Sequence, residues 1–373
     1  MIKSKFRIKL MLSALITIAA VFFSGVTVFM FFERSVTADE QGILRVAGWD
    51  VYADPEYKNK TIGFRNFEEK FGVQVEFKPL DHLDDIVDFA ELHQDYDVFI
   101  ISNEGIQLLY GMGLVIPLDL ERIPHYHDLH HSLRFSEWSL FKSRVNAVPW
   151  AWGPTGLLYN VDVLNTPPSS WDVLWDPKYH GHVSLWDDVS MIWTAALTLG
   201  YQNVYNLTRE QLKNVKEKLL KLNEQAYSYY KGEEQLMEFV IKHKVTVLNS
   251  WYDPSFRLRV QGHNFKMVIP EEGAVGMFDS YLISKGAKNQ SLAYEFINHQ
   301  ISPLIQQQMV HITGLAPANI ETLALLTPNE IKSLHLNEPD YFNRMLLWDQ
   351  MPRKPLYDDV LKAVREDMES RRK

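Results

Sequence analysis

Aromatic residues stand directly beside acidic residues at many places in this sequence, and five of these places stand out. The pairs are Trp49-Asp50, Trp186-Asp187-Asp188, Trp251-Tyr252-Asp253, Phe278-Asp279 and Trp348-Asp349. Aromatic ring faces attract organic cations, and carboxylates accept charge-assisted hydrogen bonds from N–H donors. A multiply charged amine needs several carboxylates to compensate its charge once it leaves water. The five pairs therefore predict a site for a small cationic amine, although any single pair also fits a core tryptophan beside a helix-capping acid.

The same search finds no constellation for catalysis. The chain lacks a P-loop, a G-x-G-x-x-G fingerprint, an H-E-x-x-H motif and a G-x-S-x-G elbow, and it has no cysteine. We therefore expect a protein that is not an enzyme and needs no cofactor. The histidines His125, His127, His130 and His131 allow a transition-metal site or a solvated surface, and we expect the surface.

The elements that would position these residues alternate along the chain. Apolar runs at 43–48, 73–77 and 97–101 predict strands, and the periodic stretches 62–71 and 81–92 predict helices. This βαβαβ order is typical of an α/β fold with a mostly parallel sheet and helices on both faces. Ligands bind such sheets beyond the carboxyl ends of the strands, which favours the segments Trp49–Tyr52 and Ser102–Gly105 as loops at the site.

The rest of the chain predicts a second α/β lobe. Thr208 and Gln211 form a capping-box pattern at the start of a helix over 208–222, and Val245–Leu248 reads as a strand. Pro355–Arg372 carries apolar residues at helical spacing and predicts a docking helix. A length of 373 residues suits two lobes, and the lack of a Gly/Ser linker predicts short crossings between them.

The first residues predict export. Four basic residues precede 23 uncharged residues, Leu10–Phe32, and the small-residue sequence Val36-Thr37-Ala38 follows. Cleavage after Ala38 and retention as a membrane anchor both stay open, because the uncharged run is long enough to span a bilayer. Residues 1–38 carry five basic and one acidic side chains, which leaves −13 for the exported body out of a net −9. This acidity disfavours nucleic acid as a partner.

After the export segment, nearly the whole chain resembles bacterial spermidine/putrescine-binding proteins, the periplasmic receptors of polyamine ABC importers. The resemblance is carried by the order and spacing of Trp49-x-x-Tyr52, Tyr96-Asp97-Val98 before Ser102, Pro149-Trp150-Ala151-Trp152-Gly153-Pro154-Thr155-Gly156, Ser170-Trp171-x-x-Leu174-Trp175-x-Pro177-x-Tyr179-x-Gly181, Asp187-Asp188, Ser250-Trp251, Pro270-x-Glu272-Gly273, Asp279-Ser280 and Pro317-x-Asn319. It implies a two-lobed type II periplasmic-binding fold with the ligand in the cleft between the lobes. On this basis we expect residues 39–153 and about 279–320 in lobe 1, and 154–278 and about 321–373 in lobe 2.

The resemblance also implies roles for individual residues. Trp49 and Tyr52 would stack on the ligand, Ser102 would contact an amine, Asp188 and Asp279 would be the principal carboxylates, and Trp251 would form a further wall. Asp50, Glu104, Met277 and Asp349 are additional candidates for ligand contact.

This chain departs from the family pattern at several positions. Met191 replaces a second acid, Met277 replaces an aromatic wall and Leu315 replaces a tyrosine, whereas Glu104 and Asp349 add acids. The rearranged acids indicate an amine ligand whose length is open, such as spermidine, putrescine or norspermidine. Two functions fit: a periplasmic receptor that delivers polyamine to an ABC permease, or a periplasmic sensor that signals to a membrane cyclic-di-GMP enzyme and controls biofilm formation.

Overall fold

The structure is a computed structural model that describes residues 42–52, 62–80, 82–338 and 340–372. The predicted export segment lies outside these residues. Ile43–Lys373 forms one compact unit, and everything below concerns that unit. Among the described residues, no helix has the length and apolar character needed to cross a membrane.

The first half of the central sheet is the predicted βαβαβ unit. Strand β1 (Ile43–Trp49) pairs in parallel with β2 (Gln74–Leu80) and with β3 (Val98–Ser102), and the helices α2 (Phe64–Phe71) and α3 (Leu83–Leu92) connect them. Gly72 ends α2 in the left-handed conformation, as its position predicts. Gly48 allows β1 to approach β3, because a Cβ atom there would lie 2.5 Å from the Ile100 Cβ atom. The unit therefore places the carboxyl ends of β1 and β3 side by side.

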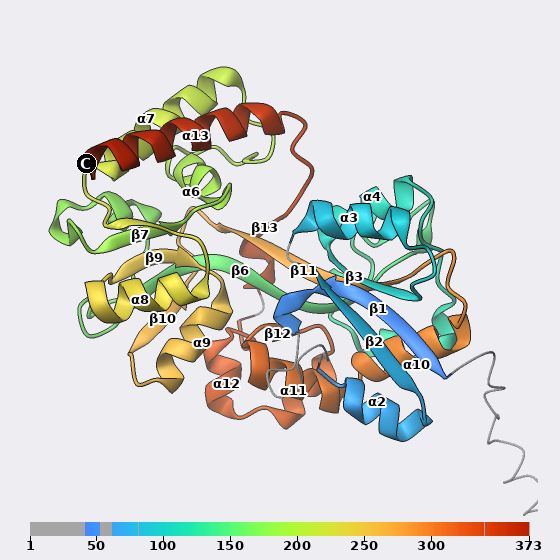
Figure 1. Cartoon of the computed structure of the whole chain (residues 1–373). Coiled ribbons are helices and arrows are strands. Elements are labelled where there is room, and N and C mark those ends of the chain that lie inside the picture. Colours follow the sequence, from blue (N-terminus) through green and yellow to red (C-terminus); the bar gives the residue numbers. More distant parts are fainter. Residues whose placement is uncertain (1–41, 53–61, 81, 339, 373) are drawn as a thin grey trace, which may run out of the picture. The chain divides into compact units, whose positions relative to one another are not determined.

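Two long strands join this half to the second one. Strand β11 (Ala274–Ile283) runs antiparallel to β3 and to β6 (Val148–Asn160). The first part of β6 pairs with β11, and its last part pairs with β9 (Val247–Ser250). The sheet order is β2-β1-β3-β11-β6-β9-β7-β8, with β10 and β12 paired to β6 and β13 paired to β11. The predicted short crossings between lobes are thus continuous strands (Figure 1).

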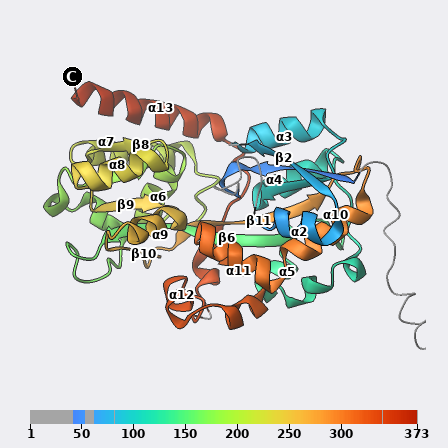
Figure 2. The same ribbon diagram turned by 60° about the horizontal axis from the view of Figure 1, so that its bottom comes forward.

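The second half repeats the α/β pattern. Strand β7 (Val183–Trp186) is parallel to both β9 and β8 (Ser228–Tyr230). Helices cover this half of the sheet (Figures 1 and 2). The predicted capping box at Thr208 begins α7, and the predicted docking helix, α13, packs against α7. The further elements of this half are β10 (Phe265–Val268), β13 (Met345–Leu347), α6 (Ser190–Thr198), α7 (Arg209–Asn223), α8 (Glu233–His243), α9 (Tyr252–Val260) and α13 (Lys354–Arg371).

The remaining helices and short strands surround the first half. They are α4 (Asn103–Gly111), α5 (His131–Arg134), α10 (Gln290–Gln300), α11 (Pro303–Thr313), α12 (Pro328–Ser333), β4 (Leu140–Phe141), β5 (Arg144–Val145) and β12 (Ala316–Pro317). Short 3₁₀ helices occupy Asp50–Tyr52, Leu120–Arg122, Pro124–Asp128, Trp171–Trp175, Pro177–Tyr179, Ile320–Leu325 and Phe342–Arg344.

Three local predictions need correction. Ser102–Gly105 is not a loop: Ser102 ends β3, and Asn103, Glu104 and Gly105 form the first turn of α4. The strand predicted at 245–248 is shifted to Val247–Ser250. Asp50–Tyr52 is a short 3₁₀ helix, not an irregular loop. After β1 and β3 the chain turns directly into a helical segment. The first side chains of that segment therefore lie close to the end of the strand.

Candidate functional site

Asp279 is the most enclosed acid among the predicted site residues. It lies within β11 opposite Ser102 of β3, and it is 3% exposed. The Tyr52 hydroxyl donates a hydrogen bond to its Oδ2 atom. Burial raises the Asp279 pKa to about 7, whereas the Tyr52 hydroxyl and the nearby Trp49 indole lower it. Trp49 acts here through proximity, because its Nε1 atom forms no hydrogen bond of regular geometry. A carboxylate with only neutral donors around it is a natural acceptor for an incoming cation.

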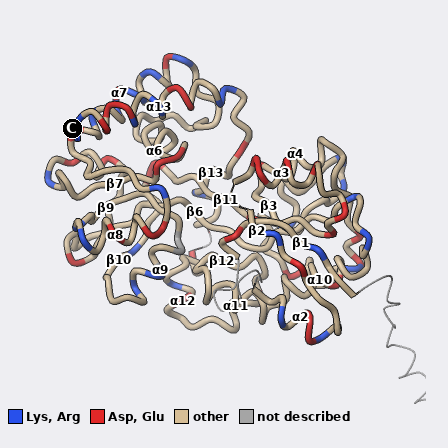
Figure 3. The backbone as a smooth tube through the Cα atoms, in the orientation of Figure 1, with Lys and Arg blue, Asp and Glu red and all other residues tan. Residues whose placement is uncertain are grey.

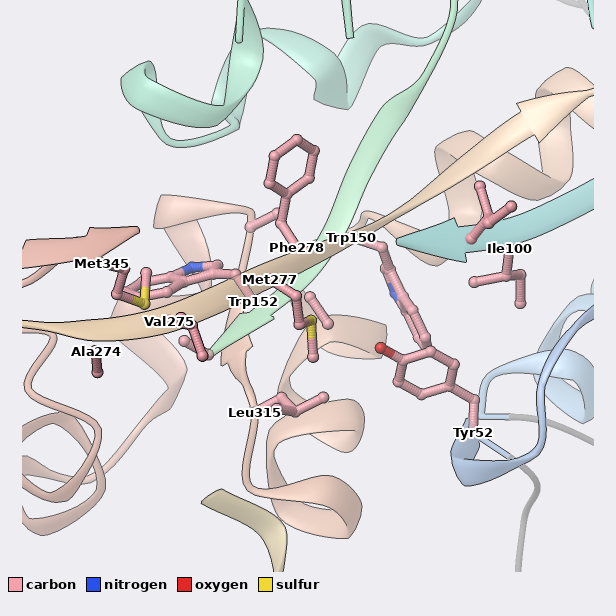
Figure 4. Close-up of a cluster of buried hydrophobic side chains, with 14 of the residues drawn as sticks. Tyr52, Ile100, Trp150, Trp152, Ala274, Val275, Met277, Phe278, Leu315 and Met345 are labelled. Carbon is pink, nitrogen blue, oxygen red and sulfur yellow. The ribbon is translucent and has the colours of Figure 1, made fainter. Parts of the chain in front are cut away.

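Packing fixes the Tyr52 side chain against the sheet. The Tyr52 ring meets Trp150 of β6 edge-to-face, with 4.3 Å between ring centroids. Met277 precedes Asp279 by two residues in β11, so both side chains lie on the same face of the sheet. Figure 4 shows Met277 and Leu315 on the side of β11 that Tyr52 approaches, and Phe278 on the other side. Met277 and Leu315 thus supply flexible apolar surface next to the Tyr52–Asp279 pair.

Glu104 is a second buried acid beside Asp279. It lies in the first turn of α4 and is 8% exposed. Its Oε1 atom accepts a hydrogen bond from the Ser102 hydroxyl at 2.9 Å, and its buried Oε2 atom has no hydrogen-bond partner. Burial raises the Glu104 pKa to about 8, the backbone and Ser102 lower it, and the charges of Asp279 and Asp349 raise it further. Ser102 and Glu104 are therefore brought together as a pair.

Asp349 joins this group through the segment that follows β13. The Asn103 side chain donates to the Trp348 carbonyl oxygen and accepts from the Phe278 backbone N–H at 3.2 Å. The Gln350 side chain donates to the Glu104 carbonyl oxygen at 2.7 Å. These bonds hold the exposed Asp349 near the first turn of α4. Sequence reasoning did not select Asn103 or Gln350, and Asn103 had only its place after a strand as a signal.

Asp188 lies in the other half of the sheet, in the turn from β7 into α6. Its Oδ1 atom accepts hydrogen bonds from the Ser190 backbone N–H at 2.8 Å and from the Ser190 hydroxyl. Burial raises the Asp188 pKa to about 6; the Ser190 hydrogen bonds lower it, the Asp187 charge raises it, and Arg365 lowers it. The neighbouring Asp187 is instead paired with Arg365, whose Nε atom lies 2.6 Å from Oδ1.

Trp251 lies at the amino end of α9 in a group of aromatic side chains. Its ring packs edge-to-face on Trp348 with 5.1 Å between centroids, and Trp348 packs on Trp193 of α6 at 5.8 Å. Trp193 in turn contacts Tyr205 at 5.2 Å. The indole N–H groups of Trp193 and Trp348 and the Ser250 hydroxyl are buried without partners. This aromatic group links α6 and α9 to the Trp348–Asp349 segment.

The structure therefore places the predicted residues in an acid group and in the aromatic group of Trp251, with Asp188 apart from both. The acid group consists of Trp49, Tyr52, Ser102, Glu104, Asp279 and Asp349, with Met277 beside it. No hydrogen bond or ion pair among the described residues joins Asp188 to Asp279, and Trp251 approaches the acid group through Trp348. Asp50 is exposed in its 3₁₀ helix.

Other surface features lie elsewhere. Two surface pockets are lined by residues outside both groups, one around 163–170 with Lys178 and Tyr179, the other around His130, Trp152 and Phe342. The histidine segment carries an ion pair between His125 and Asp128 at 3.0 Å. Within the described residues, no three histidine or acidic side chains converge as a metal site would require. Helix α13 carries basic and acidic residues together, which argues against a basic stripe for nucleic acid on this helix (Figure 3).

Comparison with protein families gives a direct match. Residues 94–343 match the model of the bacterial extracellular solute-binding proteins, and they include β3, β11 and the turn that carries Asp188. The chain belongs to this family. Its members are binding proteins, which agrees with an acid group held by neutral donors.

The chain is also similar to individual proteins of known name and to solved structures. The chain is 24% identical over 298 residues to a spermidine/putrescine-binding periplasmic protein of Salmonella typhimurium, covering 78% of this chain and 82% of that protein. It is 26% identical over 259 residues to a putrescine/cadaverine-binding protein of Pseudomonas aeruginosa, covering 66% and 72%. A spermidine/putrescine ABC transporter substrate-binding protein of Streptococcus pneumoniae superposes with a TM-score of 0.76 at 22% identity, covering 87% of this chain and 99% of that one. The predicted α/β, two-lobed periplasmic-binding fold is thus confirmed.

Proposed function

We propose that this protein binds a small polyamine of the spermidine, putrescine or norspermidine class and acts as the substrate receptor of a polyamine ABC transporter. One observation carries the proposal. Asp279 and Glu104 are buried acids whose hydrogen-bond donors are the hydroxyl groups of Tyr52 and Ser102. In the described part of the chain, neither acid forms an ion pair with a lysine or arginine. A buried carboxylate of this kind is stabilised by a cation from outside.

The surroundings suit the rest of a polyamine. The Trp49 ring beside Asp279 offers a face for an ammonium group, and Met277 offers apolar surface for methylene groups. Asp188 supplies a separate acidic point in the other half of the sheet, where Ser190 orients it. Two acidic points on different halves favour a ligand with charge at both ends. The matched relatives are named for spermidine, putrescine and cadaverine, which are such ligands.

Calorimetric titration tests this function. The purified protein would be titrated with putrescine, cadaverine, spermidine and norspermidine, and with 1,4-butanediol as the neutral counterpart of putrescine. We expect saturable binding of at least one diamine or triamine and none of the diol, because the acids compensate charge. Equal binding of the diol, or no binding of any amine, would contradict the proposal.

Location and partner follow from the same proposal. We propose export to the periplasm, with cleavage after Ala38 and an inner-membrane permease as partner, since the matched relatives are periplasmic proteins and an ABC transporter subunit. Amino-terminal sequencing of the protein from cells would detect cleavage, and a chain starting at Met1 would indicate an anchor. The lobe boundaries given above stay predictions.

The sensing alternative is separable in cells. Deletion of the gene should abolish uptake of labelled spermidine if the protein is an import receptor. Unchanged uptake together with altered cyclic-di-GMP and biofilm would instead assign the protein to signalling, and norspermidine is the ligand to add in that arm.

A further inference from the structure

The Glu104 side chain has one oxygen atom that the protein leaves unsatisfied. Glu104 is more than nine-tenths buried; Ser102 donates to Oε1, and no group of the described residues donates to Oε2. The unpartnered indole N–H groups of Trp193 and Trp348 belong to the aromatic group that is linked to α4 through Asn103. A polar atom so placed requires either a proton or a donor from a ligand.

Among the residues that the structure describes, the groups that face Glu104 offer no positive charge. The charged residues near Glu104 are Asp279 on β11 and Asp349 after β13. Burial raises the pKa of Tyr205, and the charges of Glu104 and Asp349 raise it further. Strand β3, which precedes α4, has no charged residue between Val98 and Ser102. The charged residues of α3, which packs on α4, are all exposed acids, namely Asp84, Asp85, Asp88 and Glu91. The only favourable partner for the charged form in this group is the amino end of α4 with the Ser102 hydroxyl.

We propose that Glu104 is a specificity-determining residue that exchanges a proton for an ammonium group of the ligand. In the ligand-free protein the Glu104 carboxyl carries a proton. When the ligand binds, an ammonium N–H donates to Oε2, the carboxyl proton passes to solvent, and the charges of cation and carboxylate balance. Only a nitrogen with an N–H group left over from its contacts with Asp279 or its neighbours can donate to Glu104 Oε2. The site therefore accepts primary and secondary ammonium groups and rejects quaternary ammonium. This step rests on the proposed polyamine function.

The relative pKa values of the three candidate acids support this exchange. Burial raises the pKa of Glu104 to about 8, that of Asp279 to about 7 and that of Asp188 to about 6. Of the three acids, Glu104 therefore keeps its proton to the highest pH. A bound cation lowers each pKa, so binding must release protons and affinity must rise with pH.

Titration of the purified protein with spermidine tests the exchange. Calorimetry in two buffers that differ in ionisation enthalpy and contain no primary or secondary amine counts the protons released at pH 6, 7 and 8. For the unmodified protein we expect about one proton or more per ligand at pH 7, and an affinity that rises up to about tenfold per pH unit for each proton released. At pH 8 the remaining release should come chiefly from Glu104.

Glu104→Gln separates this residue from the others. Glutamine keeps an oxygen for the Ser102 hydroxyl but carries no exchangeable proton, so proton release at pH 8 should disappear and the pH slope of affinity should decrease. Glu338→Gln is the matched control, because Glu338 is paired with Arg344 at 2.6 Å and its pKa is lowered, chiefly through His335 and Arg344 acting against desolvation. It should leave both quantities unchanged. A thermal melt checks the folding of each variant, and Glu104→Ala repeats the test if the glutamine variant is unfolded.

The outcomes distinguish the two proposals. Spermidine binding without proton release, or unchanged release in Glu104→Gln, would overturn the exchange and leave the polyamine function standing. Tight binding of choline by the unmodified protein would also overturn it, because choline has no N–H donor. Failure of every amine to bind would remove the function and the exchange together.

Discussion

Two acidic regions of this protein compensate their charge in different ways. Asp187, at the end of β7, has a side chain that is 5% exposed and is paired with Arg365 at 2.6 Å and Lys231 at 3.6 Å. Asp279 and Glu104, near the end of β3, receive hydrogen bonds from the hydroxyl groups of Tyr52 and Ser102. The first region carries its own cations and belongs to the fold. In the second, no lysine or arginine of the described residues pairs with either acid, and the proposed function assigns that role to a proton or a ligand.

The largest expected effect is on ligand affinity after loss of the central acid. Asp279→Ala should weaken polyamine binding by about 2–5 kcal/mol, because a bound ammonium would lose its buried partner. Calorimetry measures the change, and Asp279→Asn tests charge with the shape retained. An affinity within twofold of the unmodified protein would place Asp279 among structural acids and break the comparison.

Arg365→Ala should produce the opposite pattern. Loss of the guanidinium leaves Asp187 buried with the distant Lys231, so we expect the free energy of unfolding to fall by about 2–3 kcal/mol, less than for a fully buried pair because Arg365 is 41% exposed. Urea denaturation measures it. Arg371→Ala, which removes an exposed pair with Asp367 on the same helix, is the control and should lower the free energy of unfolding much less. Equal losses in both variants would remove the special status of Asp187.

The sequence predicts those parts of the fold that depend on residues close together in the chain. The capping box at Thr208, the stop at Gly72 and the alternation that forms β1, β2 and β3 depend on neighbouring residues. The turn after β3 was mistaken for a loop because a helix with Asn103 and Glu104 in its first turn lacks an apolar start. Local pattern therefore predicted the sheet and missed how closely α4 follows it.

For a similar reason, the sequence indicates only part of the contacts that hold the candidate site together. The aromatic–acid pairs and the family resemblance selected Asp279, Tyr52 and Glu104, but nothing in the sequence indicated that Asn103 binds the Trp348 carbonyl 245 residues away. The Gln350 bond to Glu104 spans 246 residues. Such contacts depend on how β11 and the segment after β13 meet α4, which only the assembled sheet determines.

Aromatic rings of this protein differ in the same way, because some already hold a cation from the chain, and this gives a smaller effect. The Trp175 ring already holds a cation from the chain, because Lys218 Nζ lies 4.5 Å from its centroid, whereas Trp49 lies beside Asp279. Trp49→Ala should therefore weaken polyamine binding by about 1–2 kcal/mol through lost cation–π contact and area. Trp175→Ala is the matched control and should change stability without changing affinity. Equal affinities for both variants would exclude Trp49 from ligand contact.

The smallest expected effect concerns Asp188, which shares features of both regions. Ser190 donates two hydrogen bonds to it, and Arg365 acts on it from a distance. Ser190→Ala removes the hydroxyl donor and should raise the Asp188 pKa above its value of about 6.

At pH 6 more Asp188 is then protonated and must lose its proton to bind a cation, whereas at pH 8 the carboxyl stays ionised in both proteins. The loss of affinity, about 1 kcal/mol or less, should therefore be larger at pH 6 than at pH 8, and calorimetry at the two pH values measures this difference. A loss that is equal at both pH values would mean that Ser190 only orients Asp188, and no loss at either would place Asp188 with Asp187 as an acid of the fold.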